Sequence, residues 1–191
     1  MPPDLDIRPL ERGDWPAIEA LFGPKGACGG CWCMWWRVRG GRAWDAAKGG
    51  PNRAAFRDLV ESGRVHGVLA FADGTPVGWC NTEPRADYVR LAHSRVLRRE
   101  GAGPGTWSIG CFYVKAGWRG RGVATRLLAA AVDLAFARGA REVEGYPKPV
   151  GPGPAPAAFV WTGTPSLYRT CGFAPLPRAE GQRDIWLRRA L

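Results

Sequence analysis

Apolar positions recur with a helical period in three stretches of the chain. These stretches are residues 11–23, 51–63 and 120–139. In the longest, Val123, Leu127 and Ala131 fall on one side of a helix, and Gly139 ends the pattern. A shorter helix is expected at residues 164–171. The pattern therefore predicts three helices of two turns or more and one short helix near the end.

Runs rich in β-branched and aromatic residues alternate with these helices. Residues 65–85 predict two antiparallel strands around a turn, in which Asp73-Gly74 is a hairpin signature. The remaining strands are predicted at residues 4–10, 107–114, 141–147, 173–176 and 184–189. No element is assigned to residues 85–99, and the proline-rich segment 149–157 is predicted to be a loop.

Length and composition favour one globular domain with a single core over the 191 residues. The formal net charge of +10 favours anionic partners, but the arginines are scattered and form no run of five or more. We therefore expect no binding to nucleic acid. The start MPPDLDIRPL resembles no secretory signal and no apolar stretch is long enough to span a membrane, so a cytoplasmic protein is expected.

The segment CGGCWCMWW, residues 28–36, holds three of the six cysteines. In a cytoplasmic setting these are expected to be reduced thiols. Cys28, Cys31 and Cys33 offer at most three metal ligands, and the paired C-x-x-C spacing of a structural zinc site is not met. No metal is expected, and a zinc or redox protein built on this cluster is the less favoured alternative.

The segment KAGWRGRGVATRLL, residues 115–128, predicts an anion-binding loop. Gly120 and Gly122 stand where a helix begins, so that its free amides can converge on a diphosphate. The P-loop pattern is missing. The dinucleotide fingerprint G-x-G-x-x-G fails because Thr125 stands at its third glycine and five residues separate the strand from Gly120.

This segment resembles motif A of the GNAT superfamily of N-acetyltransferases, [RQ]-x-x-G-x-[GA], which Arg119, Gly122 and Ala124 satisfy. The strand CFYV, the following helix, the strand REVEGYP and the late segment SLYRTCGF stand in that family's order over about residues 65–177. The resemblance implies an α/β fold with a strongly twisted mixed sheet, whose central strands splay apart to admit acetyl-CoA. It also implies an acceptor-side helical segment at about residues 13–63.

The resemblance assigns two groups of cofactor contacts. Backbone groups of Phe112, Tyr113 and Val114 would line the pantetheine arm. Those holding the pyrophosphate would be Arg119, Gly120, Arg121, Gly122, Val123, Ala124 and Thr125.

The reaction implied is direct attack of an acceptor amine on the thioester in a ternary complex. Tyr168, four positions before Gly172-Phe173, matches the family's general acid, although packing at the start of the last helix is the alternative. Because an amine with a pKa near 10.4 is neutral in roughly one molecule in 2,500 at pH 7, a base or water relay is needed. Glu144 is preferred over Glu83. Transfer through an acetylated Cys111 is less favoured, since no partner histidine is evident.

The acceptor is expected to be a small-molecule or peptide amine. In the resembled fold the cysteine-rich segment borders the acceptor pocket, so Trp32, Met34 and Trp35 are candidates to line it, with core packing as the alternative. Trp161 replaces a cofactor-contacting asparagine, and the insertion at 151–165 is expected to form an acceptor-side flap. The rival function is a non-catalytic acyl-CoA sensor, and the assembly is expected to be a monomer or homodimer.

Overall fold

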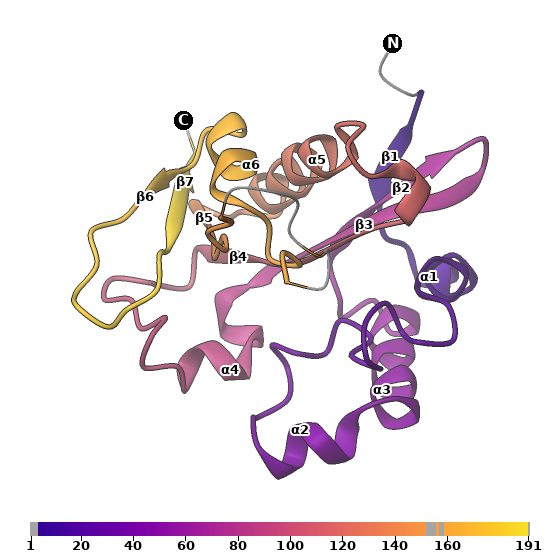
Figure 1. The fold of residues 1–191 in the computed structure, drawn as a ribbon, viewed down its shortest axis with the longest axis horizontal. Helices are drawn as coiled ribbons and strands as arrows, with labels where there is room; N and C mark the ends of the chain where they lie inside the picture. The colour runs from indigo at the N-terminus through magenta and orange to yellow at the C-terminus, as the bar shows by residue number, and fades with distance from the viewer. Residues whose placement is uncertain (1–3, 152–155, 157–158, 191) are drawn as a thin grey trace.

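The computed structural model describes residues 4–151, 156 and 159–190. These residues form one seven-stranded sheet and the helices that cover it (Figure 1). Its strands are β1 (Asp6–Pro9), β2 (Gly67–Ala72), β3 (Thr75–Pro84), β4 (Thr106–Val114), β5 (Glu142–Gly145), β6 (Ala174–Pro175) and β7 (Trp186–Arg189). They lie in the order β1-β2-β3-β4-β5-β7-β6. Every neighbouring pair is antiparallel except β4 and β5, so the sheet is mixed.

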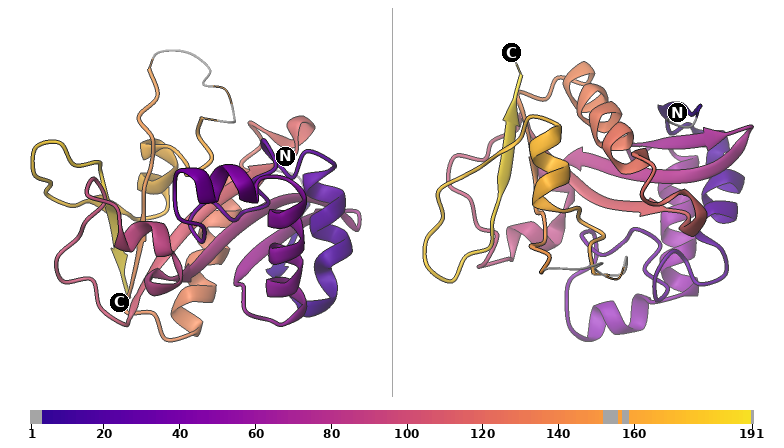
Figure 2. Two further views of the ribbon diagram at one scale, coloured as in Figure 1. Left: turned by 90° about the horizontal axis from the view of Figure 1, so that it is seen from below. Right: turned by 45° about the horizontal axis from the view of Figure 1, so that its top comes forward.

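Helices cover both faces of the sheet (Figures 1 and 2). The α-helices are α1 (Trp15–Phe22), α2 (Arg42–Ala47), α3 (Gly50–Glu61), α4 (Val89–Ala92), α5 (Val123–Ala137) and α6 (Pro165–Thr170). Short 3-10 helices span η1 (Arg12–Asp14), η2 (Arg85–Asp87) and η3 (Ala116–Trp118). Helices α5 and α6 pack on one face, whereas α1 and α3 pack on the other. No helix in the described part of the chain is both long and apolar enough to cross a membrane.

The two faces have separate apolar clusters. Along β2, Val68 packs with α5 while its neighbour Leu69 packs with α1 and α3. Side chains alternate between the faces of a strand, so a strand covered on both sides is apolar at successive positions. This explains why all six residues of β2 are buried.

The centre of the sheet opens between β4 and β5. The two strands pair only where residues 106–108 face residues 142–144, and the rest of β4 continues to Val114 without a partner on that side. On its other side, β4 carries a bulge at Gly110 and Cys111, because its register with β3 shifts there. The splayed central strands predicted from the sequence are confirmed.

The long helices and all the predicted strands are confirmed, and two short helices were not predicted. Helix α4 has only four residues, and α2 has no buried residue that would produce an apolar period. Of the flap expected at 151–165, residues 152–155, 157 and 158 lie outside the described residues.

Candidate active site

The glycine-rich loop before α5 has the geometry of an anion cradle. Gly120 and Gly122 have φ angles of 72° and 77°, which L side chains rarely adopt. Gly122 is the N-cap of α5 and offers no side chain to cap it. The amides of residues 120–125 donate to no acceptor in the part of the chain that the structure describes. They are therefore available to an anion, as the helix dipole favours.

Two arginines flank this loop. The Nε of Arg119 donates to the carbonyl of Val114 at 2.9 Å, and the guanidinium of Arg121 lies 5.5 Å from the ring centroid of Trp118. A groove of about 850 Å³ extends from Thr125 between α5, α6 and β7. Its lining also includes Ala129, Thr170, Cys171, Gly172, Ala174, Pro175, Leu176, Leu187, Arg188 and Arg189. The loop and the groove thus adjoin at Thr125, and each of them has two arginines.

The free edge of β4 carries one amide next to the bulge. The amide of Phe112 donates to the carbonyl of Trp161 at 2.7 Å. The Phe112 ring packs toward α5, and the next side chain, Tyr113, packs against Phe22 of α1 on the opposite face. Residues 112–114, predicted to contact the cofactor, therefore lie on a backbone edge that faces the opening.

Tyr168 lies beside this opening on the α5 face. Its ring packs edge-on against Phe112 and Phe173, with ring centroids 6.4 and 4.9 Å away. The side chain is fully buried, and its hydroxyl approaches the backbone of Tyr146 without a well-formed hydrogen bond. Burial raises the pKa of this phenol well above its ordinary value. Tyr168 is therefore held in the protonated form that a general acid requires.

The two candidate bases lie in one row across the sheet. Glu83 of β3 pairs with Ser108 of β4, which pairs with Glu144 of β5. Directly opposite residues point to the same face, which here is the face of Trp36 and α1. Both carboxylates are fully buried. Tyr168 and the carboxylate row thus lie on opposite faces of the opening.

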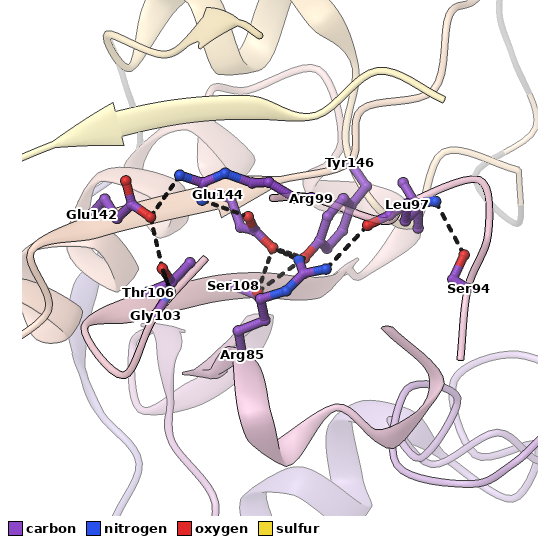
Figure 3. A network of polar contacts seen from close by, with 10 residues as sticks. All are labelled: Arg85, Ser94, Leu97, Arg99, Gly103, Thr106, Ser108, Glu142, Glu144 and Tyr146. Carbon is purple, nitrogen blue, oxygen red and sulfur yellow. Dashed lines mark hydrogen bonds and ion pairs between the residues drawn. The ribbon is translucent and has the colours of Figure 1, made fainter. Parts of the chain in front are cut away.

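Glu144 sits at the centre of a buried polar network (Figure 3). Its carboxylate contacts Arg85, Arg99, Tyr146 and Ser108; the bonds from Arg99 and Ser108 measure 2.9 and 3.2 Å. Two guanidinium groups stabilise the ionised carboxylate and offset the cost of burying it. Because Tyr146 and Ser108 are also hydrogen-bonded to each other, the network closes across the point where β4 and β5 begin to diverge.

Glu83 has a separate set of partners. The backbone amide and the Nδ1 of His66 contact its two oxygens at 2.9 and 2.7 Å, and Arg37 approaches to 2.5 Å. The amide of Asn81 donates to the same carboxylate and accepts from the Tyr88 hydroxyl. The roles of both carboxylates in proton transfer stay predictions.

The cysteine-rich segment divides between the core and the site. Trp32 and Met34 are buried in the cluster of α1 and α3, where Trp32 stacks on Trp15 at 5.7 Å. Trp35 instead contacts the ring of Trp161. Of the three candidates, only Trp35 lies with the residues near the opening. In the described residues, no group of three or more His, Cys, Asp or Glu is arranged to hold a metal.

Sequence reasoning missed an aromatic cluster next to the bulge. Its members are Trp35, Trp36, Trp44, Tyr88, Tyr146 and Trp161. The indole of Trp36 donates to the carbonyl of Gly110 at 2.8 Å, which ties the cluster to the bulge. Tyr146 could have been found from its spacing, since it stands two residues after Glu144 on the same face of the sheet. Trp36 and Tyr88 carried no such signal.

A splayed mixed sheet, a glycine loop at a helix start and a buried tyrosine beside the opening define a protein of the N-acetyltransferase class. A model of the acetyltransferase (GNAT) family matches residues 34–146. This is more than half of the chain, which therefore belongs to that family. No curated protein sequence matches the chain.

Solved structures share the fold over nearly the whole chain. An N-acetyltransferase from Staphylococcus aureus Mu50 superposes with a TM-score of 0.56 and 15% identity, covering 97% of this chain and 98% of the other. The PaiA N-acetyltransferase from Thermoplasma acidophilum, solved with coenzyme A, gives 0.55 and 15%, covering 98% and 99%. AAC(6')-Ib, solved with ribostamycin and coenzyme A, gives 0.54 and 18%, covering 97% and 93%.

Proposed function

We propose that this protein transfers the acetyl group of acetyl-CoA to an amine by direct attack in a ternary complex. The observation that carries the proposal is the placement of Tyr168 and the row of Glu83 and Glu144 on opposite faces of one opening in the sheet. A thioester held in that opening would present its sulfur to one face and its carbonyl carbon to the other.

The residues present fit acetyl-CoA. The amides of residues 120–125, which have no acceptor in the described chain, would hold the pyrophosphate, with Arg119 and Arg121 beside them. The groove that begins at Thr125 and reaches Arg188 and Arg189 would accept the anionic nucleotide end. Acetyl-CoA supplies the activated acyl group, and every other function falls to the protein.

The protein's groups then have distinct tasks. The amide of Phe112 would donate to the thioester oxygen, where negative charge develops as the amine attacks. Tyr168 would protonate the departing sulfur, for which its raised pKa keeps the proton in place. Glu144, which is paired with Arg85 and Arg99 at the vertex of the opening, would take the proton of the amine. Glu83 is the alternative base.

The acceptor would enter from the face of the aromatic cluster. Trp35 and Trp36 lie there beside the bulge, and their rings suit apolar or cationic parts of an amine. The net charge of +10 disfavours polycationic acceptors. Small-molecule and peptide amines both remain compatible with this face.

An acceptor screen tests the proposal against the sensor alternative. The purified protein is incubated with acetyl-CoA and a panel of primary amines, and release of the free CoA thiol is followed. Amine-dependent release supports the proposal. Tight acetyl-CoA binding by calorimetry, with no amine giving release above the background, would favour a sensor.

A further inference from the structure

A four-residue segment, residues 160–163, lies in the opening of the sheet and is hydrogen-bonded to both of its sides. The carbonyl of Trp161 accepts from the amide of Phe112 on β4 at 2.7 Å. The carbonyl of Gly163 accepts from the amide of Lys148, just after β5, at 2.9 Å. Residues 160–163 therefore bridge the diverging strands where an arm of acetyl-CoA would lie.

The Trp161 carbonyl and the thioester oxygen would compete for the amide of Phe112. One amide hydrogen makes one strong hydrogen bond, and the proposed function requires this hydrogen for the thioester oxygen. The Trp161 carbonyl already holds it. The thioester and Val160–Gly163 therefore exclude each other at this position.

The side chain of Trp161 anchors the segment on the acceptor face. Its ring lies 5.6 Å from Trp36 and 6.1 Å from Trp35, with the Lys148 ammonium 5.4 Å away. Trp36 is in turn bonded to the bulge through Gly110. Displacement of the Trp161 carbonyl from β4 would consequently disturb the aromatic packing that covers the acceptor face.

The segment also sits in this position at a cost. Thr162 is 1% exposed, and its hydroxyl has no hydrogen-bond partner among the described residues. A buried hydroxyl with no partner among these residues stabilises its location less than a hydrogen-bonded one would. Residues 160–163 are thus positioned to be displaced by a ligand that offers better contacts.

We propose that Val160–Gly163 is a built-in competitor for the thioester site, and that acetyl-CoA must displace it before the acceptor amine can enter. The inference rests on the proposed function. It assigns Trp161 a positioning role, because the contacts of this side chain hold the segment against β4.

The test compares acetyl-CoA binding in the wild type, Trp161→Ala, Trp161→Phe and Phe159→Ala. Trp161→Ala removes the anchor, so its Kd for acetyl-CoA should fall by about three- to tenfold as the competent fraction rises. Trp161→Phe keeps an aromatic ring and should stay near the wild type. Phe159→Ala changes an exposed side chain of the same loop and should have no effect.

Stopped-flow kinetics supply a second readout. The observed rate of acetyl-CoA binding should saturate with concentration in the wild type, because displacement limits it, and rise linearly in Trp161→Ala. The inference alone would be overturned if the wild type binds acetyl-CoA, Trp161→Ala has the same Kd, and the observed rates of both proteins rise linearly with concentration. Binding by neither protein would overturn the proposed function as well, whereas binding by Trp161→Ala only would support the competitor.

Discussion

The sulfur atoms of Cys33 and Cys111 lie 2.6 Å apart, which joins the cysteine-rich segment to the bulge of β4. Contact with the Cys33 sulfur and burial raise the pKa of the Cys111 thiol well above its ordinary value. The thiolate is the nucleophilic form of cysteine. Cys111 is therefore protonated at neutral pH and is a poor carrier of an acetyl group, although it stands beside the proposed thioester site.

Replacing Cys111 with Ala is expected to leave kcat within about threefold of the wild type, because direct attack needs no thiol at this position. Intact-mass measurement of the wild type, incubated with acetyl-CoA without an acceptor, should show no added acetyl group. An acetylated protein together with a loss of about 100-fold or more in Cys111→Ala would instead establish transfer through the cysteine.

Tyr168→Phe is expected to lower kcat by about 10²- to 10⁴-fold while acetyl-CoA binding is kept, because only the proton donor is removed. Since the pKa of Tyr168 is raised, the phenol stays protonated below pH about 10. The wild-type kcat should therefore rise with pH toward the pKa of the acceptor, with no alkaline fall below pH about 10. A falling limb near neutral pH would contradict this role.

The choice of base is tested by Glu144→Gln and Glu83→Gln. The first should reduce kcat by about 10²-fold at neutral pH, with a smaller loss as the pH approaches the pKa of the acceptor, while the second should change kcat by less than about fivefold. Urea denaturation of both variants separates catalysis from folding, because each amide keeps the volume but loses the charge opposite an arginine. The reverse ranking of the two kcat values would move the role to Glu83.

The phosphate loop is tested by Gly122→Ala, with Gly117→Ala as its control. Gly122 has a positive φ, so a side chain there strains the loop, whereas Gly117 lies in the preceding 3-10 helix η3 with no such restraint. We expect the first to weaken acetyl-CoA binding by about tenfold and the second to have little effect. A short acetyl thioester without the diphosphate should react equally with both variants. If Gly122→Ala lost as much activity toward this short donor as toward acetyl-CoA, the substitution would have disturbed β4 instead of the phosphate loop.

Stability at high pH follows from three fully buried tyrosines, Tyr88, Tyr146 and Tyr168. Burial raises the pKa of each in the folded state, while the unfolded value is about 10. The contribution of these tyrosines to the free energy of unfolding is fully present below pH about 10. Above that pH it is lost, by up to about 1.4 kcal/mol per pH unit for each tyrosine. Urea denaturation from pH about 8 to 11 measures this, and Tyr168→Phe should show a shallower decline. Equal slopes would contradict the burial of this phenol.

The sequence predicted the elements whose signal is local. Helix α5 has its apolar period, and the glycines at 120 and 122 mark its start. Tyr168 was recognised from its distance to Gly172-Phe173, and the structure places it beside the opening.

The polar and aromatic surroundings of the site could not be predicted, since they depend on contacts between distant segments. Arg85 and Arg99, which surround Glu144, come from a stretch without periodicity. The contact of the Trp161 carbonyl with Phe112 involves backbone atoms, which no side-chain pattern reports. Trp32 and Trp35 stand three residues apart, yet strained φ angles of 45° and 60° at Trp32 and Cys33 turn the chain so that one tryptophan packs in the core and the other near the site.

The central claim is tested most directly by following an isotopically labelled acetyl group from acetyl-CoA into an amine. A single turnover with the wild type, analysed by mass spectrometry, should give labelled amide and free CoA in equal amounts, with no label on the protein. Tyr168→Phe should bind the same acetyl-CoA and form the amide far more slowly. Bound acetyl-CoA that yields no labelled amide with any acceptor would contradict the account.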